Sequence, residues 1–230
     1  MALLRWKALC IDAVDPVASG AFWGDVLGLD VATVPGAEPN RVLRGDTPGR
    51  TVWINAVAEP KTVKNRVHLD LRTPSLAALG DLRRLTAPGD LPWTVLMAPT
   101  GDELCAFVDT SVERPTLKDL EIDSVDPAVI SAWWADVLGA EVHAADDASG
   151  AYSFVRGIEG APFEDVDFSP VPEPKTVKNR VHWDVTLADG ARVEDVLERG
   201  ARMLRSPDDE VRWHVLADPE GNEFCVFQGV

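Results

Sequence analysis

The chain is poor in tyrosine, cysteine, histidine and basic side chains. Among its 230 residues are one tyrosine, three cysteines and four histidines, and 22 basic residues stand against 38 acidic ones, a net charge of −16. Such a charge repels the phosphate backbone and anionic lipids, so neither nucleic acid nor a membrane surface is an expected partner. Three cysteines are too few for a disulfide scaffold, so we expect small buried thiols instead.

Long hydrophobic runs are also missing. The N-terminal segment Met1–Cys10 carries Arg5 and Lys7 inside its only apolar run, so it has no signal-peptide core. No other uninterrupted apolar stretch is long enough to cross a bilayer. The expected location is therefore the cytoplasm.

What the sequence does contain is a long internal repeat. The ten residues from Glu59 to His68 recur without a change from Glu173 to His182. Further matching pairs follow in the same order: Asp12–Pro16 with Asp123–Pro127, Trp23–Gly28 with Trp134–Gly139, and Gly101–Phe107 with Gly221–Phe227. A period of roughly 115 residues is the size of one domain rather than of a solenoid repeat. We expect two homologous domains, 1–114 and 115–230, that meet within residues 109–116.

Each half begins with a pattern typical of a strand and then a helix. Leu9 and Ile11, like Leu120 and Ile122, alternate with other residues at a period of two, as in a half-buried strand. The helix that follows is predicted to have an N-cap at Asp15 or Asp126, proline in its first turn and a C-cap at Gly28 or Gly139. Trp23 and Trp134 fall on its apolar stripe and are expected in the core.

The rest of each half predicts further strands and a second helix. Short strands are expected at 30–34, 41–43 and 51–57, at 141–144, 152–156 and 166–171, from Arg66 and Arg180 onward, and up to Val108 and Gln228, with helices near 75–85 and 190–200. Strand, helix and strands thus recur four times along the chain. This order favours an α+β fold whose twisted, mostly antiparallel sheets curve around a cavity.

Three motifs carry a resemblance to a known family. They are Asp-Pro before a Phe-Trp or Trp-Trp helix, Lys-Asn-Arg-Val-His at a strand start, and the run from Asp218 to Cys225. In these motifs both halves resemble the glyoxalase-like branch of the vicinal oxygen chelate superfamily, which also includes bleomycin-resistance proteins and extradiol dioxygenases. The resemblance implies four βαβββ modules that pair around cupped sheets. In catalytic members, a metal lies on four side chains from the first and last strands of paired modules.

The positions that the resemblance assigns to metal ligands hold an incomplete set here. They fall on Ala8 and Asp119, on Asn55 and Ser169, on His68 and His182, and on Cys105 and Cys225. We therefore favour no metal and no other cofactor. If a divalent metal binds, Asp119, His182 and Cys225 offer donor types that zinc accepts, with Glu121 on the same strand face.

Two histidines are candidates for catalysis without a metal. His68 and Asp70, and likewise His182 and Asp184, are two residues apart and share one strand face, about 6.5 to 7 Å apart at their Cα atoms. Either pair could orient a histidine for acid–base chemistry near neutral pH. The alternative is a purely structural pair that fixes the register of neighbouring strands.

Aromatic and basic side chains add candidates for ligand binding. Trp53 is expected on the His68 face, where an indole favours a flat or apolar ligand, with Asn55, Cys105, Phe107, Glu121 and Cys225 as further ligand-binding candidates. The repeated basic cluster Lys61, Lys64 and Arg66, with its copy Lys175, Lys178 and Arg180, could hold an anion. We favour a structural role in which this loop packs against a partner module.

Two functions remain open. The first is metal-free binding of a small molecule in a cavity formed by Trp53, His68, Cys105 and Phe107. The second is a lyase or isomerase in which His182 acts as base and Asp119 or Glu121 holds substrate or metal. Whether the chain is an enzyme is left undecided. We expect a monomer, since two domains can pair within one chain, although the superfamily leaves a homodimer open.

Overall fold

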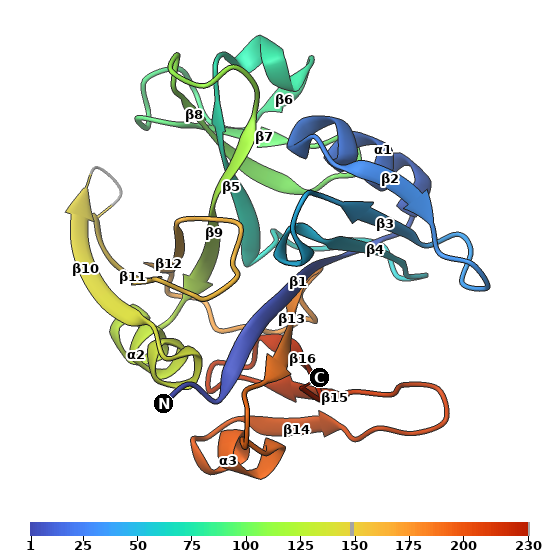
Figure 1. Cartoon of the computed structure of the whole chain (residues 1–230). Helices are drawn as coiled ribbons and strands as arrows, with labels where there is room; N and C mark the ends of the chain where they lie inside the picture. Colours follow the sequence, from blue (N-terminus) through green and yellow to red (C-terminus); the bar gives the residue numbers. More distant parts are fainter. Residues whose placement is uncertain (148–149, 230) are drawn as a thin grey trace.

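The computed structural model describes residues 1–147 and 150–229, which form two eight-stranded sheets. Sheet A has the strand order β14-β15-β16-β13-β1-β4-β3-β2, and sheet B has the order β10-β11-β12-β9-β5-β8-β7-β6. Figure 1 shows both sheets as curved layers. The α+β prediction is confirmed, and among the described residues no helix is both long and apolar enough to span a bilayer.

The elements group into four modules, numbered here 1 to 4 in chain order. Module 1 contains β1 (Leu4–Ala13), α1 (Pro16–Leu27), β2 (Asp30–Thr33), β3 (Arg41–Arg44), η1 (Pro48–Arg50) and β4 (Val52–Ala56). Module 2 contains β5 (Val67–Thr73), η2 (Leu76–Leu79), β6 (Arg83–Arg84), β7 (Thr94–Met97) and β8 (Glu103–Val108). Module 3 contains β9 (Thr116–Ser124), α2 (Pro127–Leu138), β10 (Glu141–Asp147), β11 (Gly150–Arg156) and β12 (Asp165–Pro170). Module 4 contains β13 (Val181–Leu187), α3 (Val193–Glu198), β14 (Arg202–Arg205), β15 (His214–Ala217) and β16 (Glu223–Phe227).

The modules pair across the two sequence halves. In sheet A, β1 runs antiparallel to β13, so module 1 joins module 4. In sheet B, β5 runs antiparallel to β9, so module 2 joins module 3. Figure 1 shows the first seam as the blue β1 beside the orange β13. Each concave sheet face therefore takes half of its side chains from each repeat.

Within a module, the first and last strands lie side by side and parallel. These parallel pairs are β1 with β4, β5 with β8, β9 with β12, and β13 with β16. The other strand pairs are antiparallel, as expected from the sequence. The four strands that meet at the centre of each sheet are thus the first and last strands of its two modules.

The long helices begin and end where the sequence predicts. The Asp15 carboxylate accepts hydrogen bonds from the N–H groups of Val17 and Ala18 at 3.1 and 2.9 Å, and Gly28 ends α1 in the left-handed conformation. Asp126 and Gly139 do the same for α2. The predicted helix at 75–85 is wrong. Only the short 3-10 turn η2 forms there, because Gly80 follows at a positive φ that ordinary residues disfavour.

The equivalent tryptophans Trp23 and Trp134 are both fully buried, but only one indole N–H has a partner. Trp134 Nε1 donates to Asp218 Oδ2 at 3.1 Å. Trp23 Nε1 has no partner within residues 1–147 and 150–229, because Ala98 stands at the position equivalent to Asp218. A buried donor without an acceptor costs about 1 to 3 kcal/mol. The first half therefore carries a local defect that the second half lacks.

Supplying that acceptor should stabilise the protein. Asn222, which donates to Asp218 in the second half, is Asp102 in the first, so the change must be Ala98→Asp together with Asp102→Asn. We expect the free energy of unfolding to rise by about 1 to 2 kcal/mol relative to Asp102→Asn alone, measured by urea denaturation. A double variant no more stable than that single variant would contradict the role assigned to Trp23 Nε1.

Candidate functional site

The concave face of sheet B contains a cavity of about 250 Å³. Its floor comes from the first and last strands of modules 2 and 3, and the side chains on β7, β11 and the adjoining loops form its rim. The lining residues are Lys64, His68, Asp70, Trp93, Val95, Glu103, Cys105, Phe107, Lys118, Glu121, Asp123, Tyr152, Asp167 and Ser169. Both sequence halves thus contribute to one chamber.

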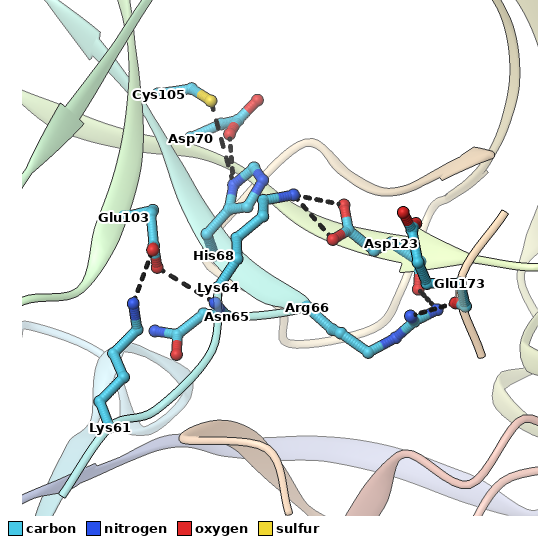
Figure 2. Close-up of polar contacts among 10 residues, drawn as sticks. All are labelled: Lys61, Lys64, Asn65, Arg66, His68, Asp70, Glu103, Cys105, Asp123 and Glu173. Atoms are coloured by element: carbon cyan, nitrogen blue, oxygen red, sulfur yellow. Dashed lines mark hydrogen bonds and ion pairs between the residues drawn. The ribbon is translucent and has the colours of Figure 1, made fainter. Parts of the chain in front are cut away.

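His68 and Asp70 lie together on the floor of this cavity. Alternation along β5 places both side chains on the same face. The His68 Nδ1 to Asp70 Oδ1 distance is 3.3 Å, and Cys105 Sγ lies 4.0 Å from the same nitrogen (Figure 2). Burial alone lowers the pKa of His68, but Asp70 and Glu121 outweigh it, so the pKa of His68 is raised. His68 is therefore poised to hold a proton close to neutral pH.

Glu121 and Asp167 bring two more carboxylates to Asp70. Glu121 lies opposite His68 on β9, and Asp167 lies beside Glu121 on β12. Ligand oxygens of Asp70, Glu121 and Asp167 all lie within 4.8 Å of one another. Burial, followed by the charge of Asp70, raises the pKa of Glu121 to about 7. Burial, followed by the charges of Asp119 and Glu121, raises the pKa of Asp167 to about 9.

Close carboxylates of this kind cannot all be ionised without compensation. At neutral pH the cluster of Asp70, Glu121 and Asp167 therefore retains protons or holds a cation. Glu121 Oε1 is buried and has no hydrogen-bond partner among the described residues. An orphaned acceptor beside two carboxylates and a histidine is what a cation or a ligand proton would satisfy.

One wall of the cavity is aromatic. The rings of Trp93 and Phe107 stack with centroids 5.3 Å apart and an interplanar angle of 28°. Lys118 Nζ lies 4.8 Å from the centroid of the Phe107 ring and forms an ion pair with Asp119. A broad apolar plane with one cation at its edge suits a flat ligand with a polar end.

Sheet A repeats part of this arrangement. His182, Asp184, Cys225, Trp213 and Phe227 occupy the positions of His68, Asp70, Cys105, Trp93 and Phe107. The Trp213 and Phe227 rings also stack, at 5.0 Å and 24°. Modules 2 and 4 have therefore retained the same half of the site.

The other half of sheet A has different chemistry. Module 1 carries Cys10 where module 3 carries Glu121, and Trp53 where module 3 carries Asp167. Lys7 Nζ contacts Asp184 at 3.1 Å and lies 3.8 Å from the Phe227 ring centroid. The groups of three donors that could hold a cation within residues 1–147 and 150–229 all lie in sheet B.

The pKa of His182 is also shifted in the direction opposite to that of His68. Burial lowers the pKa of His182, and its buried Nδ1 has no hydrogen-bond partner in the described part of the chain. Asp184 instead accepts hydrogen bonds from Lys7 and, at 3.4 Å, from the Cys10 thiol. The imidazole of His182 is therefore neutral at pH 7, and its aspartate is engaged elsewhere.

The repeated basic motif forms ion pairs with the carboxylates of neighbouring strands. Lys61 donates to Glu103 at 2.6 Å, and Lys64 donates to both oxygens of Asp123 (Figure 2). Arg66 Nη1 donates to the carbonyl of Glu173 in the other copy of the motif at 2.6 Å. Lys175, Lys178 and Arg180 make the equivalent contacts with Glu223, Asp12 and the Glu59 carbonyl. These contacts support the structural role: the two motifs link the sheets reciprocally.

Several combinations predicted from the sequence are not formed. His182 and Cys225 lie in sheet A, whereas Asp119 and Glu121 lie in sheet B, so His182 acts with neither carboxylate and the zinc set of Asp119, His182 and Cys225 does not assemble. Trp53 pairs with Cys10 in sheet A and does not share a face with His68. The prediction that Trp53 shares a cavity with His68, Cys105 and Phe107 is therefore wrong, whereas the other three residues do line one cavity. The physical reason is the pairing of modules across halves.

Other predicted residues are brought together. His68, Asp70, Cys105, Phe107 and Glu121 all line the sheet B cavity. Asn55 remains with Trp53 on β4, next to Asp12 of β1. Cys10, Cys105 and Cys225 are free and buried, as predicted. Catalytic roles for the two His-Asp pairs remain predictions.

Neither Asp167 nor Lys118 is among the site residues predicted from the sequence. Asp167 is two residues from Ser169 on a strand of period two, so its place on the cavity face could be read from the sequence. The partners of Asp167 could not be read from the sequence in this way. Glu121 lies 46 residues away on β9, and Asp70 lies in the first half of the chain. The register of β5 and β9 shifts directly after the pair of Asp70 and Asp119, and Lys118 and Glu121 line the cavity, whereas Asp119 is not among the lining residues.

The donors of sheet B fit a divalent cation. Carboxylate oxygens from Asp70, Glu121 and Asp167 form one group of hard donors, and His68, Asp70 and Cys105 form a second group that shares Asp70. The unpartnered Glu121 Oε1 supports the fit. The sequence-based preference for no metal considered each half separately and could not include this combined set.

Comparison with known proteins agrees with the fold. Residues 8–107 and 119–227 match the family described as glyoxalase-like domain, and no curated protein matches the sequence. Glyoxalase I from Zea mays has a TM-score of 0.67 at 12% identity, covering 97% of this chain and 92% of that one. A Bacillus subtilis protein described as a "putative dioxygenase" has a TM-score of 0.63 at 13% identity, covering 99% and 86%. At such identities the structures share the fold alone, whereas the family match spans both halves: the chain belongs to the glyoxalase-like domain family.

Proposed function

We propose that the sheet B cavity is the active site of a lyase or isomerase that moves a proton on a small, flat molecule. The observation that carries this proposal is the convergence of Asp70, Glu121 and Asp167 beside His68, inside a cavity with room for a ligand. Perturbed acids at the floor of a cavity are typical of sites for proton transfer.

Glu121 is the group we assign to proton transfer. Its pKa of about 7 lets it accept and return a proton at neutral pH, and its Oε1 has no competing hydrogen bond among the described residues. The pair of His68 and Asp70 lies next to it and can stabilise the charge that develops on the ligand. Without a cation, Asp167, with its pKa raised to about 9, keeps a proton at pH 7 and can donate a hydrogen bond, and a bound cation would displace that proton.

A divalent cation belongs to this proposal. Asp70, Glu121 and Asp167 would hold it, and His68, which lies 3.3 Å from Asp70, would complete the set beside Cys105. When bound, such an ion supplies Lewis acidity toward a ligand oxygen. The residues of the chain orient the ligand, which stacks on the wall of Trp93 and Phe107 with its polar end directed toward the carboxylates.

The duplicated chain supplies its own control. We expect the protein to bind Mn²⁺ or Zn²⁺ after dialysis against a weak chelator. We expect His68→Ala to weaken this binding by at least about 10-fold. The equivalent His182→Ala should leave it unchanged, because sheet A lacks the carboxylate cluster. Isothermal titration calorimetry and metal content per chain measure both. If His182→Ala lost the metal and His68→Ala kept it, the metal site would lie in sheet A and not in sheet B.

Turnover requires a separate measurement. Flat carbonyl compounds incubated with the protein in D₂O should exchange carbon-bound protons, detected by NMR, and Glu121→Gln should abolish the exchange. Exchange that persists in Glu121→Gln would refute the role of this residue.

Metal-free binding is the second candidate, and the raised pKa values of Glu121 and Asp167 favour it, because retained protons can also neutralise the cluster. A binder of this kind should show ligand-induced thermal shifts that a chelator does not change. For either function we propose that the protein is a monomer and lies in the cytoplasm, as predicted from the sequence.

A further inference from the structure

A second cavity lies at the turn between β1 and α1, away from the sheet B site. Its volume is about 200 Å³. The lining residues are Asp12, Ala13, Val14, Asp15, Ala18, Lys61, Pro99, Thr100, Asp102 and Arg180. It thus lies where module 1 meets the β7–β8 turn of module 2 and the second copy of the basic motif.

In the other repeat, a glutamate fills the equivalent place. The Glu220 carboxylate accepts hydrogen bonds from Asp126 N at 2.8 Å and from Val125 N at 3.1 Å. It also accepts a hydrogen bond from the Ser124 hydroxyl at 2.8 Å. The turn that precedes α2 is therefore a carboxylate-binding site whose ligand belongs to the chain itself.

In the first repeat, that carboxylate is absent. Thr100 stands at the position of Glu220, and its hydroxyl donates to Asp102 instead. The N–H groups of Val14 and Asp15 are equivalent to those of Val125 and Asp126, and they have no hydrogen-bond acceptor among the described residues. Truncation of one side chain has thus left both the cavity and its backbone donors.

Charges around the cavity permit an anion. Arg180 has no carboxylate within 4.0 Å among the described residues, and its positive charge is uncompensated by an ion pair. Of the neighbouring carboxylates, Asp12 is paired with Lys178, and Asp15 caps α1. Asp102 accepts hydrogen bonds from Asn65 and Thr100. The equivalent turn accommodates Glu220 next to Asp123 and Asp126, which match Asp12 and Asp15.

We propose that this cavity binds the carboxylate group of a small organic acid, held by the N–H groups of Val14 and Asp15 beside Arg180. Glu220 shows the contacts that such a ligand makes. The site is independent of the proposed chemistry in sheet B, because it shares no lining residue with that cavity.

The chain again offers matched variants. Sodium acetate or formate, compared with sodium chloride at equal ionic strength, should raise the Tm of the wild-type protein by about 2 °C or more. In ¹⁵N NMR spectra the amide signals of Val14 and Asp15 should shift with saturation. Thr100→Glu should fill the cavity with its own carboxylate, raise the Tm without acetate and abolish the response to acetate. Thr100→Gln controls for filling without charge.

A reciprocal variant tests the donor arrangement. Glu220→Ala should lower the Tm, and acetate or formate should restore part of the loss by entering the vacated place. One outcome would overturn the proposal: acetate restores the Tm of Glu220→Ala but does not shift the amide signals of Val14 and Asp15 in the wild-type protein. The donors of the first repeat would then bind only water. The amide readout does not depend on whether Thr100→Glu folds, and none of these measurements depends on enzymatic turnover.

Discussion

Without divalent cations, the protein should lose stability steadily as the pH rises from 7 to 9, and Asp167→Asn should remove this loss. Asp167 has a pKa of about 9 in the folded protein, against an ordinary value of 3.8. Between these two values the folded state holds a proton that the unfolded state has released. The stabilising contribution is therefore fully present below the ordinary pKa and is lost as the pH approaches 9.

The slope follows from proton linkage. One extra proton in the folded state lowers the free energy of unfolding by about 1.4 kcal/mol per pH unit. Glu121 adds to this slope below its pKa of about 7, so the dependence should be steeper between pH 5 and 7 than between pH 7 and 9. Urea denaturation at several pH values, in the presence of a chelator, measures both slopes.

Three comparisons make this measurement specific. Asp167→Asn should remove the pH dependence of the free energy of unfolding between pH 7 and 9. Asp81→Asn, a substitution of an exposed residue, should leave this dependence unchanged. Saturating Mn²⁺ should reverse the sign of the dependence if the carboxylates hold the ion, since cation and protons then compete. A wild-type protein whose stability does not change between pH 7 and 9 would show that Asp167 is ionised and compensated in the folded state.

Most of the local structure follows from the sequence because it depends on neighbours along the chain. The capping residues Asp15 and Gly28 determine the ends of α1, and the period of two around His68 determines which side chains of β5 share a face. The predicted helix at 75–85 is wrong because Gly80, at a positive φ, follows the single 3-10 turn between β5 and β6.

The candidate site could be predicted only in part, because it depends on which modules pair. His68 and Asp70 belong to the cavity, as their strand face indicates, but their partners Glu121 and Asp167 come from the second repeat. Pairing within a half and pairing across halves bury similar apolar faces, since β1 and β9 are equivalent in the repeat. The choice depends on how the linker and the two basic motifs connect the modules, as with Arg66 and Glu173.

Pairing across halves predicts that neither half folds alone as a monomer. Residues 1–114 contain β1 and β5, and their antiparallel partners β13 and β9 both lie in residues 115–230. An isolated half would leave two central strands with unpaired backbone groups and would expose core residues such as Ile11 and Leu69 to water. Because the net stability of a domain is only about 5 to 15 kcal/mol, the loss of these contacts should be enough to unfold the isolated half.

The equivalence of the modules leaves one way for the first half to fold. In a homodimer of residues 1–114, β1 of one copy could pair with β5 of the other, as it pairs with β13 in the full chain. We expect fragment 1–114 to be unfolded when dilute and dimeric when concentrated, and fragments 1–114 and 115–230 to associate into one heterodimer when coexpressed. Analytical ultracentrifugation with circular dichroism measures these states. A folded, monomeric fragment 1–114 would show that β1 and β5 can pair within one half, and the combined site of His68 with Glu121 and Asp167 would then lose its structural basis.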